Sequence, residues 1–358
     1  MQYQKPEGLK VGVIGYGGAF NMGQQHLAEM QKAGMTPAAA CDLDKERLEI
    51  AKQDFPGIAV FTSVEEMLDE SEVNMAVIIT PHNTHAELAL KCLRKGCHVV
   101  CEKPLAITTE ECDEMIAEAR KQNLVLSTYH NRHWDRCILR AREQIESGVI
   151  GDVVRIEAHM GRHGKPGDWW RTSRTISGGI LYDWGVHLLE YSLQLLPGAG
   201  MTEVSSYFKE GVWADQTAWK EDTNEDEAYA VIRFDTGQWL TLGVTHLDPN
   251  PKPGQLEITG TKGTYIFDGG TWKTITIEDG VKVTREGNNP PSEGWRFYQN
   301  IADHLVKDDE LIITRNGPGA RFMCSILLER APTAAPHARR CTANAAGRPS
   351  EVQKASRK

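Results

Sequence analysis

A glycine-rich turn between an apolar run and a helical pattern constrains this chain more than any other feature. The apolar run covers residues 10–14, Gly15 and Gly17 follow it directly, and the helical pattern begins at Gly23. Such a turn presents backbone N–H groups and a helix N-terminus to a pyrophosphate. Asp42 ends the next apolar run, where an acidic group can accept hydrogen bonds from an adenosine ribose. This stretch therefore predicts a dinucleotide-binding βαβ unit.

The turn departs from the common G-x-G-x-x-G spacing, because its third glycine is delayed to Gly23. We expect the additional loop residues to contact the cofactor. The carboxylate of Asp42 would repel a ribose 2′-phosphate, so we expect NAD rather than NADP. The predicted cofactor contacts in this unit are Gly15, Gly17, Gly18, Phe20, Asn21, Met22 and Asp42.

Strand and helix patterns alternate through the rest of the first half. Four further apolar runs follow the first one, at residues 36–41, 73–80, 97–101 and 124–128. Helical patterns separate them, and one begins with a T-x-x-E capping box at Thr108. This alternation predicts a doubly wound parallel sheet of the Rossmann type over residues 1–130.

The second half is rich in strand patterns separated by turn signals such as DTGQ and GTKG. The predicted strands are residues 153–160, 204–208, 228–234, 239–246, 256–259, 264–267, 274–277 and 281–284. Helices are expected near residues 180–196 and 295–305. Residues 131–330 are therefore predicted to form a substrate-binding and oligomerisation α+β domain with an open, mainly antiparallel sheet. The tail, residues 331–358, has no aromatic residue and is expected to be disordered.

The bulk properties exclude several classes of protein. No apolar run approaches the roughly 20 residues that span a bilayer, and the N-terminus lacks a signal-type apolar stretch, so we expect a cytoplasmic location without membrane contact. The net charge is -9, which disfavours a nucleic-acid partner.

The eight cysteines form no C-x-x-C pair and are read as reduced thiols. No metal site is expected. The His130/His133 pair is not followed by a strong third ligand, and the His159/His163 pair straddles the end of a predicted strand, so its two rings need not converge.

Three predicted strands of the first half end in residues suited to ligand binding, since ligands bind where parallel strands end. Thr80-Pro81 follows one strand, Glu102-Lys103-Pro104 a second, and Asn131-Arg132 comes shortly after a third. The lysine precedes a proline and is therefore held extended. Its ammonium group could bind a substrate oxygen and stabilise an alkoxide. Taken alone, Lys103 is read as a solvated lysine in a turn, and it is the context of the neighbouring strand ends that favours the functional reading.

The predicted helix of the second half carries Asp183 and His187 four residues apart, on one helix face. Histidine can act as a general base near neutral pH, and the aspartate could orient it or bind a neighbouring hydroxyl. A surface ion pair is the plain alternative. Trp169, Trp170 and Arg171 precede this segment, and paired tryptophans beside an arginine suit a sugar ring. The plain alternative is that either tryptophan fills the core.

These residues together resemble the Gfo/Idh/MocA oxidoreductase family, the glucose–fructose oxidoreductase and inositol dehydrogenase group. The resemblance covers nearly all of residues 8–328. It implies a Rossmann domain followed by a domain whose open sheet commonly forms a dimer or tetramer contact, so a homodimer or homotetramer is expected. It implies that Lys103, Asp183 and His187 surround a substrate hydroxyl beside the nicotinamide. The further cofactor contacts expected on this basis are Thr80, Pro81, His82, His85, Glu102, Lys103 and Asn131.

The resulting hypothesis is NAD-dependent oxidation of a secondary hydroxyl on a small carbohydrate or polyol. His187 would remove the hydroxyl proton and Lys103 would stabilise the alkoxide, while Asp183 orients His187 or binds an adjacent hydroxyl. Arg132, Trp170 and Arg171 would shape the sugar pocket together with these three residues. Two alternatives stay open: an NAD-dependent glycoside hydrolase that acts through transient oxidation and elimination, and a non-catalytic NAD-sensing regulator.

Overall fold

The computed structural model describes residues 3–17 and 21–314, and the backbone of residues 339–340. Its first half forms a six-stranded sheet in the order β3-β2-β1-β4-β5-β6, in which every pair is parallel. The strands are β1 Lys10–Ile14, β2 Thr36–Cys41, β3 Ala59–Phe61, β4 Met75–Ile78, β5 His98–Cys101 and β6 Leu126–Thr128. The helices between them are α1 Met22–Lys32, α2 Lys45–Asp54, α3 Val64–Glu70, α4 His85–Arg94 and α5 Thr109–Lys121. The predicted Rossmann sheet is confirmed.

Local signals explain several of these helix boundaries. The capping box at Thr108 is formed, because its side chain accepts from the N–H of Glu111 and the Glu111 carboxylate accepts from the N–H of Thr108. The sequence analysis did not anticipate β3 and α3, which are short and follow weak apolar patterns. All six cysteines of the described residues are buried, and none of these six is in a disulfide.

The second half forms a nine-stranded sheet in the order β14-β13-β12-β11-β7-β10-β9-β8-β15, with one parallel pair among antiparallel ones. Its strands are β7 Val153–Gly161, β8 Met201–Lys209, β9 Glu227–Phe234, β10 Trp239–Thr245, β11 Leu256–Gly260, β12 Gly263–Phe267, β13 Thr271–Glu278, β14 Val281–Asn288 and β15 Arg339–Arg340. Its helices are α6 Arg136–Glu146, α7 Arg174–Ser177 and α8 Trp184–Gln194. The predicted mainly antiparallel sheet is thus confirmed.

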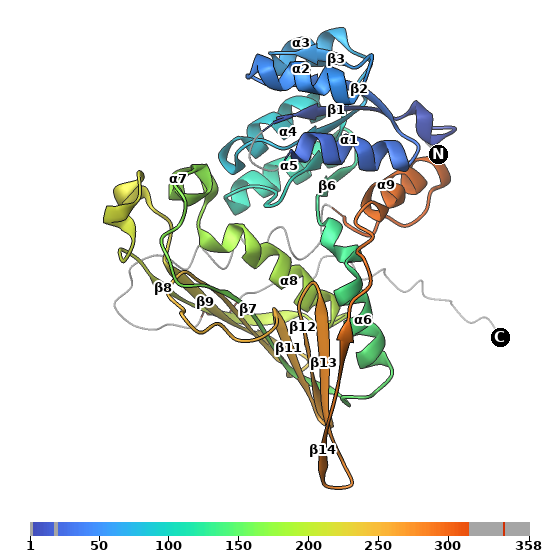
Figure 1. Cartoon of the computed structure of the whole chain (residues 1–358). Coiled ribbons are helices and arrows are strands. Elements are labelled where there is room, and N and C mark those ends of the chain that lie inside the picture. Colours follow the sequence, from blue (N-terminus) through green and yellow to red (C-terminus); the bar gives the residue numbers. More distant parts are fainter. Residues whose placement is uncertain (1–2, 18–20, 315–338, 341–358) are drawn as a thin grey trace, which may run out of the picture.

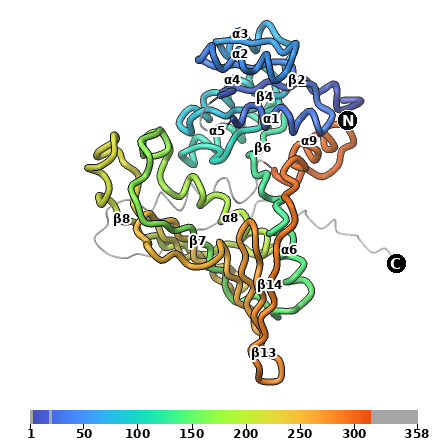
Figure 2. Tube along the Cα trace, in the orientation of Figure 1, coloured from blue at the N-terminus to red at the C-terminus, as the bar shows by residue number. Residues whose placement is uncertain are grey.

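The last long helix of the described residues, α9 Arg296–Lys307, returns to the first sheet (Figures 1 and 2). Its apolar face packs in one cluster with β1 and α1 residues, including Val11 and Leu27. Phe297 and Tyr298 are almost completely buried there. The range of α9 lies within residues 131–330, which were predicted for the second domain. The helix nevertheless completes the core of the dinucleotide-binding half.

Helix α8 lies between the two sheets and covers the inner face of β7 and β10 (Figure 1). The outer face of the second sheet is open in the described structure and exposes aromatic side chains, among them Tyr207, Tyr229 and Trp239. None of the described helices is long and apolar enough to cross a membrane. The carboxyl ends of the first sheet's strands face α8, and this junction holds the candidate site.

Candidate active site

The glycine turn after β1 is built around Asp42. One carboxylate oxygen of Asp42 accepts from the N–H of Gly17 at 3.0 Å, and the other accepts from the N–H of Asp44 at 2.9 Å. The carboxylate therefore ties the turn to the end of β2, and each of its oxygens retains a lone pair for a ribose hydroxyl. Asn21 has a φ of 50° and immediately precedes α1, whose first residue is Met22. The predicted contacts Gly18 and Phe20 lie outside the described residues.

Two glycines of this turn cannot carry a side chain. A Cβ on Gly23 would lie 2.5 Å from the carbonyl oxygen of Tyr16, a backbone atom that cannot move aside. Gly15 has a φ of +90°, and its Cβ would lie 3.2 Å from the backbone of Ile79. The delayed glycine therefore permits the close approach of helix and strand that a dinucleotide-binding turn requires.

The strand-end turns of β4 and β5 are linked by His85. One ring nitrogen of His85 lies 2.8 Å from the carbonyl oxygen of Pro104, and the other lies 2.9 Å from that of Thr80. Both nitrogens thus face backbone groups of the protein. His85, predicted as a cofactor contact, connects the Thr80-Pro81 turn to the Glu102-Lys103-Pro104 turn. In this way it holds the two turns that the resemblance assigns to the cofactor.

Glu102 is held from α1 and α9. One of its oxygens lies 3.2 Å from a ring nitrogen of His26, and the other accepts from the N–H of Lys103 at 3.0 Å. The second ring nitrogen of His26 lies 2.5 Å from the hydroxyl of Tyr298 in α9. Burial would raise the pKa of Glu102, but His26 and Lys103 outweigh it and lower the pKa. Glu102 is therefore a charged group with internal partners.

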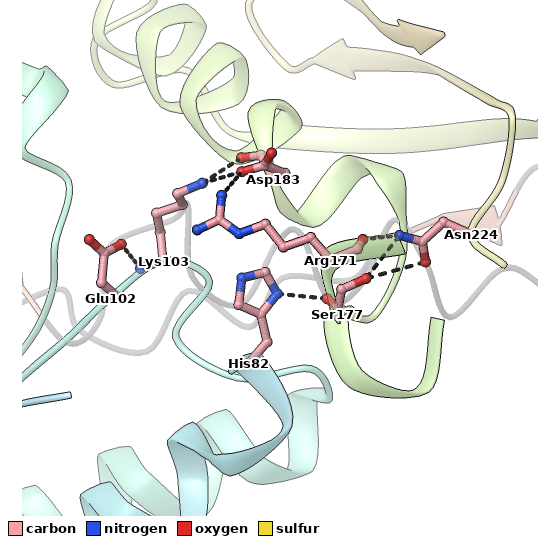
Figure 3. A network of polar contacts seen from close by, with 7 residues as sticks. All are labelled: His82, Glu102, Lys103, Arg171, Ser177, Asp183 and Asn224. Carbon is pink, nitrogen blue, oxygen red and sulfur yellow. Dashed lines mark hydrogen bonds and ion pairs between the residues drawn. The ribbon is translucent and has the colours of Figure 1, made fainter. Parts of the chain in front are cut away.

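Lys103, Arg171 and Asp183 form the ion-pair cluster at the centre of the site (Figure 3). The ammonium group of Lys103 donates to Oδ1 of Asp183 at 2.6 Å and to its carbonyl oxygen at 3.2 Å. The guanidinium group of Arg171 donates to the same Oδ1 at 3.0 Å. Burial would raise the pKa of Asp183, yet Lys103 and Arg171 lower it to about 2. The carboxylate is therefore ionised, and Lys103 keeps one N–H for another acceptor.

Asp183 lies outside the helix, where the sequence analysis had placed it inside. Helix α8 begins at Trp184, and Asp183 has a non-helical backbone with φ of -89° and ψ of -88°. Gly178 and Gly179 both have positive φ and turn the chain just before it. The expected placement of Asp183 and His187 on one helix face is thus wrong. Instead, the side chain of Asp183 turns toward Lys103, on the other half of the molecule.

His187 is buried in α8 and faces a cationic environment. Burial is the largest cause that holds its pKa well below 6.5, and Lys103 and Arg132 lower the pKa further. Its ring packs against Trp184, with 5.5 Å between ring centroids. Nδ1 of His187 is buried and has no hydrogen-bond partner among the described residues. The imidazole is therefore neutral at neutral pH, because burial and the nearby cations disfavour its protonated form.

A cleft of about 310 Å³ opens beside this cluster. Its wall includes His82, Arg171 and Asp183 from the predicted site. Nδ1 of His82 donates to the carbonyl oxygen of Ser177 at 2.8 Å (Figure 3), while its Nε2 is buried with no partner among the described residues. Both halves of the chain thus contribute to the cleft.

Several predicted side chains, among them Lys103 and His187, are not part of the cleft lining. Trp170 contacts the ring of His82 at a centroid distance of 4.7 Å, and its neighbour Trp169 lines the cleft. Arg132 lies over the ring of Trp184 and pairs with Asp135 at 3.2 Å. The side chain of Asn131, a predicted cofactor contact, lies beside Gly294, where a Cβ would be 3.1 Å from its Nδ2.

The sequence analysis missed several residues of the site. The lining residues not predicted from the sequence include Arg162, Trp184, Asn224, Glu225 and His246, whereas Trp169 is one of the two tryptophans considered there. Two of these, Arg162 and His246, directly follow strands, so a search of strand ends in the second half would have found them. Arg47 was missed as well. Its side chain lies over Gly17, where a Cβ would be only 2.3 Å from Cδ of Arg47.

Comparison with known proteins agrees with this architecture. A profile described as "Oxidoreductase family, NAD-binding Rossmann fold" matches residues 9–130, and the GFO/IDH/MocA C-terminal domain matches residues 138–266. Among solved structures, an NAD-binding protein from Listeria innocua superposes with a TM-score of 0.72 and 27% identity, over 89% of this chain and 92% of that chain. A levoglucosan dehydrogenase in complex with NADH and levoglucosan has a TM-score of 0.76 and 19% identity, over 90% and 96% of the two chains, a likeness of fold.

Sequence relatives point the same way. Two Schizosaccharomyces pombe oxidoreductases, C115.03 and C26H5.09c, are 37% identical, but the match spans only 40% of this chain and 40% of each relative. The scyllo-inositol 2-dehydrogenase (NADP(+)) IolW of Bacillus subtilis is 29% identical over 82% of this chain and 76% of that protein. The myo-inositol 2-dehydrogenase of Thermotoga maritima is 28% identical over 84% and 86%. The uncharacterized oxidoreductase YdgJ of Escherichia coli is 32% identical over 85% and 90%. The chain therefore belongs to the Gfo/Idh/MocA oxidoreductase family and carries its NAD-binding Rossmann domain.

Proposed function

We propose that this protein oxidises a secondary hydroxyl of a sugar, a polyol or a sugar derivative, with NAD as the hydride acceptor. One observation carries the proposal: Lys103 from the dinucleotide-binding half meets Asp183 from the second half in a partly buried ion pair beside a cleft. The first half is expected to hold the cofactor and the second half the substrate. A lysine at their junction can contact a substrate that reacts at that cofactor. Relatives that include two inositol dehydrogenases support the class of substrate.

The residues of the first half fit a dinucleotide. Gly15 and Gly23 leave no room for side chains at the turn, and the carboxylate of Asp42 lies at the end of β2, where a ribose is expected to bind. When bound, NAD supplies the hydride acceptor for the reaction. The Thr80-Pro81 turn and Lys103 would border its nicotinamide end.

Asp42 favours NAD, because its charge opposes a 2′-phosphate. Arg47 has the opposite influence, since an arginine near this position can accommodate that phosphate. In this structure Arg47 lies over Gly17, and its guanidinium group is 4.0 Å from the Asp44 carboxylate. The neighbouring carboxylates of Asp42 and Asp44 therefore offset the charge of Arg47, so we propose NAD as the preferred cofactor.

The protein groups have distinct parts in the proposed reaction. The substrate hydroxyl loses its proton to neutral His187 and its carbon loses a hydride, which leaves a ketone. Lys103 donates its remaining N–H to the substrate oxygen and stabilises the negative charge that develops there. Asp183, fixed by Lys103 and Arg171, holds the ammonium group of Lys103 in position. Trp169 and Trp184 offer apolar faces to the C–H groups of a sugar ring.

A screen for cofactor reduction tests this proposal directly. The purified protein would be incubated with sugars, polyols and sugar acids, each with NAD and with NADP, and absorbance of the reduced cofactor would be followed. We expect reduction of NAD with at least one member of the panel. Release of aglycone from an aryl glycoside without accumulation of NADH would contradict the proposal and favour glycoside hydrolysis. Tight NAD binding with no reaction across the panel would favour a sensing role.

A further inference from the structure

The one parallel strand pair of the second sheet, among the described strands, places two basic side chains together in the cleft. β7 and β10 run parallel, with Gly161 opposite Thr245 at their carboxyl ends. Arg162 and His246 are the next residues, and the N–H of Arg162 donates to the carbonyl oxygen of Thr245 at 3.0 Å. Both side chains line the same cleft as Asp183. Neither has a part in the hydride-transfer step described above.

Arg162 differs from the other cations of this region in its partner. Arg171 pairs with Asp183 at 3.0 Å, Lys165 with Asp168 at 2.8 Å and Arg174 with Glu210 at 2.9 Å. The guanidinium group of Arg162 instead donates to Nε2 of His246, at 3.4 Å. No carboxylate within the described ranges lies within the 4.0 Å ion-pair distance of Arg162.

His246 cannot supply the missing negative charge. Its Nε2 accepts from Arg162, so its proton is on Nδ1, which is buried and has no acceptor among the described residues. Burial and the charge of Arg162 lower its pKa to about 4, which keeps the ring neutral at neutral pH. The positive charge of Arg162 is therefore not compensated by its hydrogen-bond partner.

Counted over the charged lining residues and Lys103, the cleft has one more cation than carboxylates. Arg162, Arg171, Asp183 and Glu225 line it, and Lys103 is bonded to Asp183. These groups contribute three positive and two negative charges. Such a balance suits a ligand with one negative charge. Arg162 is exposed to solvent in the cleft, where its guanidinium group can form charge-assisted hydrogen bonds with a carboxylate.

We propose that the substrate is a sugar acid whose carboxylate binds Arg162 while its reacting hydroxyl lies at Lys103. This inference rests on the proposed function and names its class of substrate. Arg162 makes no ion pair with Asp183 although both line one cleft, so the two ends of a single sugar can contact them separately. A phosphate ester, which carries up to two negative charges, fits this single uncompensated cation less well.

The experiment compares each acid with its uncharged amide, so that only the charge differs. The probes are D-glucuronate and D-galacturonate, their amides, the parent sugars, D-gluconate and glucose 6-phosphate. Binding would be measured by calorimetry and by thermal shift in the presence of NADH, and turnover by NADH formation with NAD. The variants are Arg162→Gln and, as a matched control, Arg155→Gln. Arg155 is on the same strand and pairs with Glu157 at 3.1 Å, outside the cleft lining.

We expect at least one acid to bind and react better than its amide by about tenfold or more, a charge-assisted contribution. Arg162→Gln should bring acid and amide to near equality, mainly through KM, while Arg155→Gln preserves the preference. Equal affinity for acids and amides, a preference for glucose 6-phosphate, or a charge preference that survives Arg162→Gln would overturn this inference. NADH formation from neutral sugars alone would contradict the sugar-acid inference and would still support the proposed function. A protein that neither oxidises nor binds any probe would contradict both.

Discussion

The two sheets of this molecule bring side chains to the site by different rules. In the first sheet all strands are parallel, so their carboxyl ends meet at one edge. The turns after β4, β5 and β6 therefore lie close together, as strand order alone predicts. In the second sheet nearly all strands are antiparallel, so consecutive strand ends alternate between opposite edges. Among the described strands of the second sheet, only the parallel pair β7 and β10 repeats the arrangement of the first sheet, and there Arg162 and His246 meet.

This difference explains which site residues a sequence can reveal. A residue after a strand in a parallel sheet is at the ligand edge by default, which is how Lys103 was found. A residue after a strand in an antiparallel sheet is at the ligand edge only if the strand has the right direction. Four tests separate the contributions of the two halves, from the largest expected effect to the smallest.

Replacing Lys103 should break the connection between the halves. Lys103→Ala removes the donor to both Asp183 and the substrate oxygen, so turnover should fall by about 10²–10⁴-fold. The dinucleotide turn is untouched, so NAD affinity should stay close to normal. Steady-state NADH formation and NAD titration measure the two quantities. Lys95→Ala, at an exposed lysine that pairs with Asp69, is the control. Turnover within tenfold of the wild type would disprove the assignment.

Gly23→Ala should act on the first half alone. The new Cβ would lie 2.5 Å from the carbonyl oxygen of Tyr16, and forcing atoms into a packed site costs about 1–3 kcal/mol. NAD affinity should therefore fall by about tenfold, measured by fluorescence titration, with a lower melting temperature. Gly269→Ala is the matched control, because no atom lies within 4 Å of its added Cβ. Normal NAD affinity in Gly23→Ala would refute the close-packing role of the delayed glycine.

Tyr298→Phe tests whether α9 belongs functionally with the first half. The change leaves the buried Nδ1 of His26 without its partner, which should lower the free energy of unfolding by about 1–3 kcal/mol. Because His26 also contacts Glu102, the KM for NAD should rise modestly. Urea unfolding provides the measurement, and Tyr207→Phe, at a side chain 61% exposed, is the comparison. If both variants have the same free energy of unfolding, the His26–Tyr298 contact does not contribute to stability.

The pH profile should show the smallest change. The pKa of His187 is held well below 6.5 by burial and nearby cations, so the neutral form persists as the pH falls through 6.5. We expect that protonation of His187 does not lower kcat/KM between about pH 8 and 6. An acid limb centred near 6.5, with NAD affinity constant over the same range, would show instead that His187 titrates normally.

The candidate site was partly predictable. The glycine turn, Asp42 and Lys103 follow from spacing and strand order, and the structure places all of them at the expected edge. The Asp183–His187 argument failed because it assumed an unbroken helix, whereas Gly178 and Gly179 turn the chain and Lys103 binds both the carboxylate and the carbonyl of Asp183. The choice of Trp170 over Trp169 as a cleft residue could not be settled by adjacency alone, because neighbouring side chains point in different directions.

The sequence by itself determined the parallel first sheet, the mainly antiparallel second sheet and the dinucleotide-binding turn, because each depends on local periodicity and on glycines at fixed positions. Tertiary structure alone decided that α9 returns to the first sheet, that Asp183 pairs with Lys103, and that Arg162 meets His246. These contacts join residues far apart in the chain. Their formation depends on which surfaces bury one another and on the direction in which each strand runs, and no local pattern encodes either.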